Sequence, residues 1–363
     1  MPPLPSAGRA ALAIGAACAA LYGCQSAGQA LLTLMPGVTN DPQNRTLRRE
    51  LMGMGSGQFC GELTKRGAAL KLRDEQPAIG RFYAQACDYK ELPNGDAFVQ
   101  FGGFGYGWMQ PTDRIGFEAA GAIQYNPDFL LDGSTMYAYF RPRSVQSTNF
   151  LTKKIGRELV AGPLGAIITG SVGDLANRLG SQMVSQELQK GFTVIRDKSG
   201  AVDFGLGIVE KGQRPFHPFD VRGSDKVTLA DDISEVHGEQ REFVGPLEID
   251  GDKRALYLTM NLDGVPAIDV IVLRKDMGDV WLKQYIYVGG TSPLPGAAAA
   301  GDVLPAGAAW KRAYPLPKGL YYVVLDNTST AGNVAPPPGT PGVLGTSDTP
   351  ATVRYVAQLG DAP

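Results

Sequence analysis

The sequence predicts an α+β fold, with N-terminal helices, an antiparallel meander and an amphipathic helix followed by an all-β sandwich domain. Apolar residues recur at helical spacing within residues 154–191, whereas residues 97–143 and the chain from residue 242 onward show the period of two that is typical of strands. The chain of 363 residues also contains 47 glycines and 26 prolines, a composition that favours turns and β-structure over helical bundles.

A chain of this length is sufficient for two folded domains. The changes of pattern along it predict a signal peptide at residues 1–23, a tether at 24–44, an α+β domain at 45–212, a linker at 213–240 and a β-sandwich domain at 241–363. Prolines and glycines cluster in the linker, where they interrupt regular structure.

The first 24 residues have the layout of a secretory signal. Arg9 precedes an uncharged stretch, Ala10 to Leu21. As a helix, this stretch would span only about 18 Å, whereas a hydrocarbon core is about 30 Å thick. A permanent transmembrane anchor is therefore not expected.

The end of this stretch, Leu21-Tyr22-Gly23-Cys24, resembles a bacterial lipobox, in which a signal peptidase cuts before a cysteine that carries lipid. The resemblance implies lipidation of Cys24 and a mature protein held at the membrane by its acyl chains. Tyr22 departs from the pattern, being bulkier than the usual Ala, Ser or Thr. Gln25 follows the cysteine instead of Asp, which by the same resemblance implies the outer membrane. An ordinary cleaved signal peptide is the alternative.

In an exported protein, the pair Cys60 and Cys87 is expected to form a disulfide. Closing a loop of that length stabilises a fold by about 3–4 kcal/mol in the chain-entropy model. A two-thiol metal site is the alternative, although the pair lacks CxxC spacing and an adjacent histidine. Two short helices are expected within residues 46–72 and a third from Pro77 to Cys87, so the disulfide would join these helices.

The meander is predicted from three runs, Ala97–Met109, Arg114–Tyr125 and Thr135–Arg141, separated by turn residues at 111–113 and at 126–128 with 132–133. An amphipathic helix with a stripe of Val172, Leu175, Leu179, Met183 and Leu188 is expected to cover a sheet. A β-hairpin from residues 192–196 to 201–209 follows.

The first run of the meander alternates glycines with aromatic residues. Its aromatic face is the candidate ligand-binding surface, formed by Phe104, Tyr106 and Trp108 together with Tyr137 and Tyr139. Aromatic platforms bind sugars, aryl groups or lipid chains. The competing interpretation, favoured by the usual burial of large aromatic residues, is that this face packs beneath the amphipathic helix as core. The opposite glycine face would let another backbone or helix approach closely.

Seven strands are predicted after the linker, and together they argue for a β-sandwich. They are Glu242–Ile249, Arg254–Leu262, Ala267–Arg274, Val280–Val288, Ala309–Pro315, Gly319–Asp326 and Ala351–Leu359, with loops at 289–307 and 331–350. The segments 241–247, 256–258 and 316–325, with Tyr355, are similar to bacterial pre-peptidase C-terminal-type domains and related jelly-roll modules. The resemblance implies an accessory or binding module without catalysis. Residues 45–212 show no family resemblance.

The residues able to carry chemistry are few. The chain has two histidines, His217 and His237, and neither lies in a pattern typical of a catalytic triad. No enzyme activity and no metal-ligating residues are therefore predicted. Asp231-Asp232 and Asp250-Gly251-Asp252 could offer oxygens to Ca²⁺, although the second is also a typical hairpin turn. A formal net charge of −2 shows no electrostatic signal for nucleic acid.

These observations predict a lipid-anchored protein of the bacterial cell envelope, at the outer membrane, with a structural or binding role and an envelope protein or glycan as partner. One alternative is a carrier that holds a hydrophobic ligand or sugar between the meander and the helix at 172–190. The other is a hydrolase that uses His217 or His237 as its base.

Overall fold

The computed structural model describes residues 40–41, 43–44, 59–65, 67–73, 75–109, 113–155, 177–178, 180–182, 185–186, 189–196, 202–221, 224–288, 291–338, 340–342, 345–347 and 349–363. The predicted signal peptide and Cys24 lie outside these residues. The described part is mainly β-structure, so the predicted α+β class with N-terminal helices is wrong. No helix within it has the length and apolar character needed to cross a membrane.

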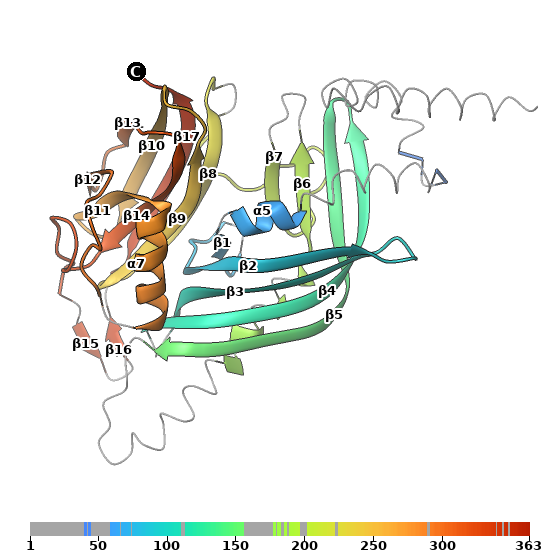
Figure 1. Cartoon of the computed structure of the whole chain (residues 1–363), viewed down its shortest axis with the longest axis horizontal. Helices are drawn as coiled ribbons and strands as arrows, with labels where there is room; N and C mark the ends of the chain where they lie inside the picture. Colours follow the sequence, from blue (N-terminus) through green and yellow to red (C-terminus); the bar gives the residue numbers. More distant parts are fainter. Residues whose placement is uncertain are drawn as a thin grey trace, which may run out of the picture.

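The N-terminal part is one antiparallel sheet whose seven strands follow one another in chain order (Figure 1). The strands are β1 (Ala68–Leu70), β2 (Gly80–Glu91), β3 (Ala97–Met109), β4 (Asp113–Asp132), β5 (Thr135–Ile155), β6 (Phe192–Arg196) and β7 (Val202–Leu206). The predicted meander and hairpin are therefore present, within a larger sheet. Helix α5 (Phe59–Lys65) lies against β2.

The sheet bends strongly, and β4 and β5 turn away from β2 and β3 at their far ends (Figure 1). Bulges account for this bend. The pairing of β4 with β5 shifts register three times, and each shift places one extra residue in β5, at Arg143, Gln146 and Lys153. An extra residue on one strand lengthens that side and curves the pair.

One helix prediction and one turn prediction in this part are wrong. The segment predicted as a helix from Pro77 to Cys87 contains most of strand β2. Its alternation was hidden because both faces of β2 are covered: Phe82 packs with Phe117 on one face, and Tyr83 packs with Tyr322 on the other. The turn predicted at residues 126–128 lies inside β4. Pro127 is tolerated there because the pairing with β3 ends at Tyr125, which leaves one edge of β4 free.

The C-terminal part confirms the predicted β-sandwich. Eight strands form two four-stranded sheets, in the orders β13-β10-β17-β8 and β12-β11-β14-β9. Successive strands cross between the two sheets, except that β11 and β12 pair directly; this is the arrangement of an eight-stranded jelly roll. Their bounds are β8 (Val227–Val236), β9 (Gln240–Ile249), β10 (Arg254–Asp263), β11 (Ala267–Arg274), β12 (Ala300–Pro305), β13 (Trp310–Pro315), β14 (Gly319–Asn327) and β17 (Ala351–Asp361).

Three predictions for this part need correction. The strand predicted at Val280–Val288 is a helix, α7 (Lys275–Tyr287). Its buried residues have helical spacing, being Gly278, Trp281, Leu282, Tyr285 and Ile286. Strand β8 lies in the segment expected to be an irregular connection, and β12 lies in the loop predicted at 289–307. The short strands β15 (Thr340–Gly342) and β16 (Gly345–Ser347) form a hairpin in the loop predicted at 331–350.

Helix α7 packs between the two parts of the molecule (Figure 1). One buried cluster contains residues of β2, β3, β9, β11, β14 and α7, including Tyr83, Tyr106, Phe243, Trp281 and Tyr322. The contact with β4 is close: a Cβ added at Gly116 would lie 2.0 Å from the carbonyl oxygen of Ile286. A side chain larger than hydrogen at position 116 would therefore push α7 away.

Candidate functional site

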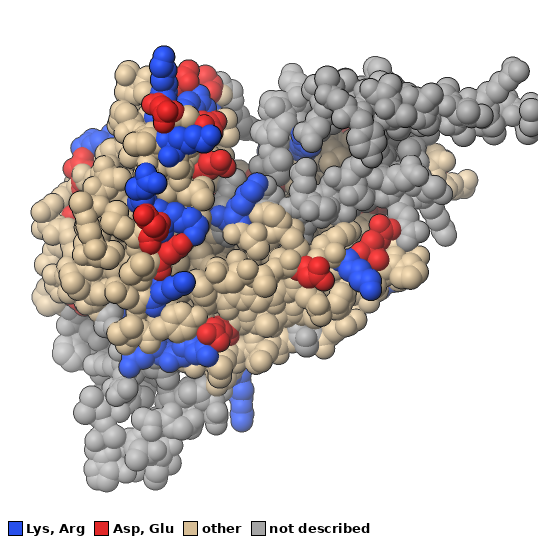
Figure 2. Space-filling view, viewed as in Figure 1, with Lys and Arg blue, Asp and Glu red and all other residues tan. Residues whose placement is uncertain are grey.

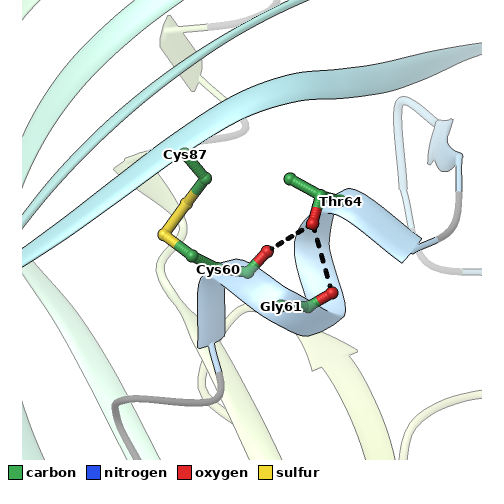
Figure 3. Close-up of a disulfide and its surroundings, with 4 residues drawn as sticks. All are labelled: Cys60, Gly61, Thr64 and Cys87. Atoms are coloured by element: carbon green, nitrogen blue, oxygen red, sulfur yellow. Dashed lines mark hydrogen bonds between the residues drawn. A yellow bond between two sulfur atoms is a disulfide. The ribbon is translucent and has the colours of Figure 1, made fainter.

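The disulfide predicted between Cys60 and Cys87 is present and joins α5 to β2 (Figure 3). The two Cα atoms are 5.2 Å apart and the residues are 27 apart in the chain. The bridge holds α5 on the face of the sheet where Leu63 packs against a cluster that includes Phe82 and Phe117. These two thiols therefore form a crosslink and not a metal site.

The aromatic face of β3 packs against the jelly roll and α7. Tyr106 is 3% exposed, and its ring meets that of Tyr285 edge to face with 5.1 Å between centroids. Trp108 stacks on the imidazole of His237, with the ring centroids 3.9 Å apart and the planes 6° apart. The apolar stripe of the helix predicted at 172–190 lies outside the described residues; the partners described for the aromatic face of β3 are α7 and strands of the jelly roll.

The glycine face of β3 is filled by aromatic rings from the neighbouring strands. Gly105 pairs with Phe82 on one side and Phe117 on the other. A Cβ at Gly105 would lie 2.6 Å from Phe117 Cζ, and the rings of Phe82 and Phe117 are nearly parallel, at 4°. Because Gly105 has no side chain, the rings of Phe82 and Phe117 can pack over its backbone, a known way of covering a glycine in a sheet.

Tyr137 and Tyr139 lie at the far end of the sheet. Their rings are 6.3 Å apart and form a separate cluster with Ile195. The five aromatic residues predicted as one ligand surface therefore belong to two places: three face the jelly roll, and these two lie near β6. Alternation grouped the three residues of β3, whereas Tyr137 and Tyr139 pair with the far end of β4 and with β6.

A buried polar network joins the N-terminal sheet to the jelly roll. Arg81 of β2 donates to Glu242 of β9 from Nη2 at 2.6 Å, and donates to the hydroxyl of Tyr355 at 3.1 Å. The hydroxyl of Tyr106 donates to the second carboxylate oxygen of Glu242 at 2.7 Å and accepts from the backbone N–H of Phe243 at 2.7 Å. Burial and the neighbouring Glu242 hold the pKa of Tyr106 well above its usual value, so it stays a neutral donor.

The backbone strengthens the same junction. Ala78 bridges to Ser234 on β8, with its N–H donating to the carbonyl of Ile233 at 2.7 Å and its carbonyl accepting from Glu235 at 2.9 Å. Lys71 forms an ion pair with Asp232 beside this contact. The two parts are therefore held together by packing, hydrogen bonds and charge pairs.

The two histidines suggested as catalytic bases are engaged with carboxylates. His217 Nε2 lies 3.0 Å from Asp203 of β7, and its Nδ1 lies 3.8 Å from Asp231 of β8. His237 Nε2 lies 2.7 Å from Glu235, under the stacked ring of Trp108. His217 thus contacts β7 and β8, and His237 contacts β8 and β3.

The acidic pairs suggested for Ca²⁺ also have protein partners. Asp231 and Asp232 contact His217 and Lys71 respectively. Asp250 pairs with Arg254 across the hairpin turn between β9 and β10, as the turn interpretation predicts. Among the described residues, no three His, Cys, Asp or Glu side chains gather as a metal site requires. Figure 2 shows charges of both signs interspersed over the face it presents.

A shallow hollow opens on the aromatic face of the sheet, next to the end of α7. Its volume is about 390 Å³. Two adjacent rows of the sheet form it: Gly102, Ala120 and Asn149 face one another across β3, β4 and β5, and Phe104, Glu118 and Leu151 form the next row. Gln85 of β2 and Tyr287 of α7 complete the rim. Of the predicted ligand residues, Phe104 is the one that lines this hollow.

The carboxylate of Glu118 is held in place at the rim. Lys153 lies 2.9 Å from one of its oxygens, and the hydroxyl of Tyr287 donates to the other at 3.2 Å. The hydrogen bond from Lys153 lowers the pKa of Glu118 below its usual value, so the group is an anion at neutral pH. The sequence did not single out Glu118 or Tyr287, because the signal depends on a contact between β4 and a helix 169 residues later.

No protein-family model matches this chain, and neither does any curated protein. Among solved structures, a chain of infectious bursal disease virus, Gx strain, is similar at 14% identity. The match covers 47% of this chain and 43% of that chain with a TM-score of 0.19, a level that supports no assignment of fold or function.

Proposed function

We propose that this is a lipid-anchored, non-catalytic binding protein of the bacterial cell envelope, attached to the outer membrane through acyl chains on Cys24. The observation that carries the proposal is the disulfide between Cys60 and Cys87, because structural disulfides form and persist in exported proteins. Together with a lipobox-like sequence at Leu21 to Cys24, it supports export followed by anchoring.

The binding role is supported by the hollow beside Phe104 and Tyr287. It lies at the junction of the sheet and α7, on a frame fixed by the network of Arg81 and Glu242. A non-catalytic role agrees with the engagement of His217 by two carboxylates, which leaves its ring nitrogens directed at acids and not at a hydroxyl nucleophile.

The test is the intact mass and the membrane fractionation of the full chain expressed in a Gram-negative host. The proposal expects a mature protein that begins at Cys24, carries acyl chains and sediments with the outer membrane. Cys24→Ala should abolish acylation and release the protein from the membrane. Cys18→Ala is the matched control, because Cys18 lies inside the signal stretch and its loss should change neither result. A wild-type protein that is unacylated and released in soluble form would refute the anchor.

A further inference from the structure

The floor of the hollow is a tract of small residues in the sheet. Gly102 and Ala120 pair directly across β3 and β4, and a Cβ added at Gly102 would come no closer than 3.9 Å to any neighbour. The tract can therefore accept a flat group lying against the backbone. Small residues alone do not select a class of ligand, so the side chains around this floor determine which ligand fits.

One wall is apolar. The rings of Phe104 and Tyr287 meet at 66°, with 6.1 Å between centroids, and so form a corner. Leu151, 48% exposed, and Tyr287, 37% exposed, are among the large apolar side chains left open to solvent. A ligand with an apolar face would cover these groups while the phenol oxygen remains bonded to Glu118.

The rest of the rim is polar and can form hydrogen bonds with a ligand. Gln85 is the extra residue of a bulge in β2, and Asn149 lies on β5; both side chains are exposed. Neither amide has a hydrogen-bond partner within the described part of the chain, and each can donate and accept. The carboxylate of Glu118 adds a fixed acceptor. Donors and acceptors thus surround an aromatic corner.

This combination selects among ligand classes. An anionic ligand would meet the Glu118 carboxylate, whose counter-ion Lys153 is already paired with it. A long acyl chain would keep much of its own surface in water at so shallow a site, and where it covered the two amides it would remove their hydrogen bonds to water. A neutral sugar ring has an apolar C–H face for the corner and hydroxyls for the amides and the carboxylate. The volume of about 390 Å³ lies near the lower end of the range of about 300–1,000 Å³ for ligand sites.

We propose that the hollow binds one neutral pyranose unit of an envelope glycan, with its ring against Phe104 and Tyr287 and its hydroxyls bonded to Gln85, Asn149 and Glu118. This inference rests on the binding role proposed above and names the ligand class of that site.

The experiment is calorimetric titration of the detergent-solubilised full chain with the neutral oligosaccharides cellohexaose, chitohexaose and maltohexaose. At least one should bind. Gly102→Val should weaken that binding by about tenfold or more, because the new side chain occupies the floor while its Cβ has 3.9 Å of space. Tyr287→Ala should weaken it similarly by removing the corner.

The matched control is Gly301→Val on β12, where a Cβ would make ordinary contact at 3.4 Å with the carbonyl of Val270. It introduces the same side chain into a strand of the jelly roll and should leave affinity unchanged. A thermal melt of each variant separates loss of the site from loss of the fold.

Failure to bind any of the three sugars, or binding that survives Gly102→Val unchanged, would overturn the glycan assignment. Neither result would affect acylation at Cys24, so an acylated, membrane-bound protein without sugar affinity would refute this inference alone. Conversely, a soluble protein that binds sugar through this hollow would refute the lipid anchor at Cys24 and support the proposed sugar site.

Discussion

Arg81 and Glu242 lie 161 residues apart in the chain, yet Nε and Nη2 of the guanidinium both donate to the same carboxylate oxygen, at 2.8 and 2.6 Å. Both side chains are almost excluded from solvent, with exposures of 6% and 3%. The remaining groups of the pair bond to Gly67, Tyr106 and Tyr355, so each charge is desolvated and fully surrounded by partners. This pair links strand β2 of the N-terminal sheet to strand β9 of the jelly roll.

Removing one partner of this pair should cost much more than removing an exposed ion pair. Glu242→Ala leaves the Arg81 charge buried and uncompensated, and the free energy of unfolding should fall by about 3–5 kcal/mol. Asp263→Ala breaks the exposed pair with Arg354, where exposures are 61% and 42%, and should cost no more than about 1 kcal/mol. Urea titration monitored by circular dichroism measures both values. Equal losses would show that the buried pair does not hold the junction.

The disulfide should stabilise the fold by restricting the unfolded chain. Replacing both cysteines, as Cys60→Ser with Cys87→Ser, opens a loop of 27 residues and should lower the free energy of unfolding by about 3–4 kcal/mol. Adding a reductant to the wild type should produce a similar loss, seen as a lower melting temperature. The double-serine protein serves as the control, since a reductant should not change its melting temperature. A wild type that melts at the same temperature with and without reductant would contradict the prediction.

The approach of α7 to the sheet should depend on a glycine. Gly116→Ala places a methyl group 2.0 Å from the carbonyl oxygen of Ile286 and should destabilise the protein by about 1–3 kcal/mol through forced movement of α7. Gly102→Ala is the matched control, because its methyl group has 3.9 Å of space on a neighbouring strand. Thermal unfolding compares the two variants. If the two melt alike, α7 does not pack against β4 as closely as described.

Stability should decrease as the pH rises from about 5 to about 8, through the contact of His217 with Asp203 and Asp231. The hydrogen bond to Asp203 raises the pKa of His217 above its usual value. A raised histidine pKa stabilises the fold at pH values below the unfolded pKa of about 6.5, and this stability is lost as the pH rises through the folded pKa.

Asp231 should likewise make the protein less stable as the pH rises. Burial raises its pKa to about 7, so between the ordinary value of 3.8 and about 7 the folded state retains a proton that the unfolded state has lost. His217→Gln and Asp231→Asn should each flatten the dependence of the unfolding free energy on pH between 5 and 8. A wild type whose stability rises over this interval would contradict the assignment.

Much of the local structure could be predicted from the sequence. Strand β3 and strand β11 have the predicted bounds, and the hairpin of β6 and β7 was expected from its turn. Period-two alternation identified β3 because its glycines alternate with aromatic residues. It failed for β2, whose Phe82 and Tyr83 are both buried by different partners. The helical spacing of Trp281, Leu282 and Tyr285 was present in the sequence, but a β-rich context obscured it.

The candidate site was less predictable. The sequence identified Phe104 as an aromatic residue on a glycine-bearing strand, but it offered no reason to connect it to Tyr287 or Glu118. Gln85 enters the hollow because a bulge shifts β2 at that residue, and a bulge leaves no local signal that distinguishes it from a regular strand.

Neighbours along the chain set the strand period, the turn positions and a cysteine pair suited to an oxidising compartment, and these features can be read from the amino acids alone. Three contacts depend on the folding of the whole chain: the aromatic face of β3 meets the jelly roll, Arg81 meets Glu242, and α7 completes a hollow on the sheet. Those contacts join residues more than a hundred positions apart, and the local pattern around each residue carries no information about which distant surface will cover it. Burial, bulges and close backbone approach select the partner when the two parts pack together.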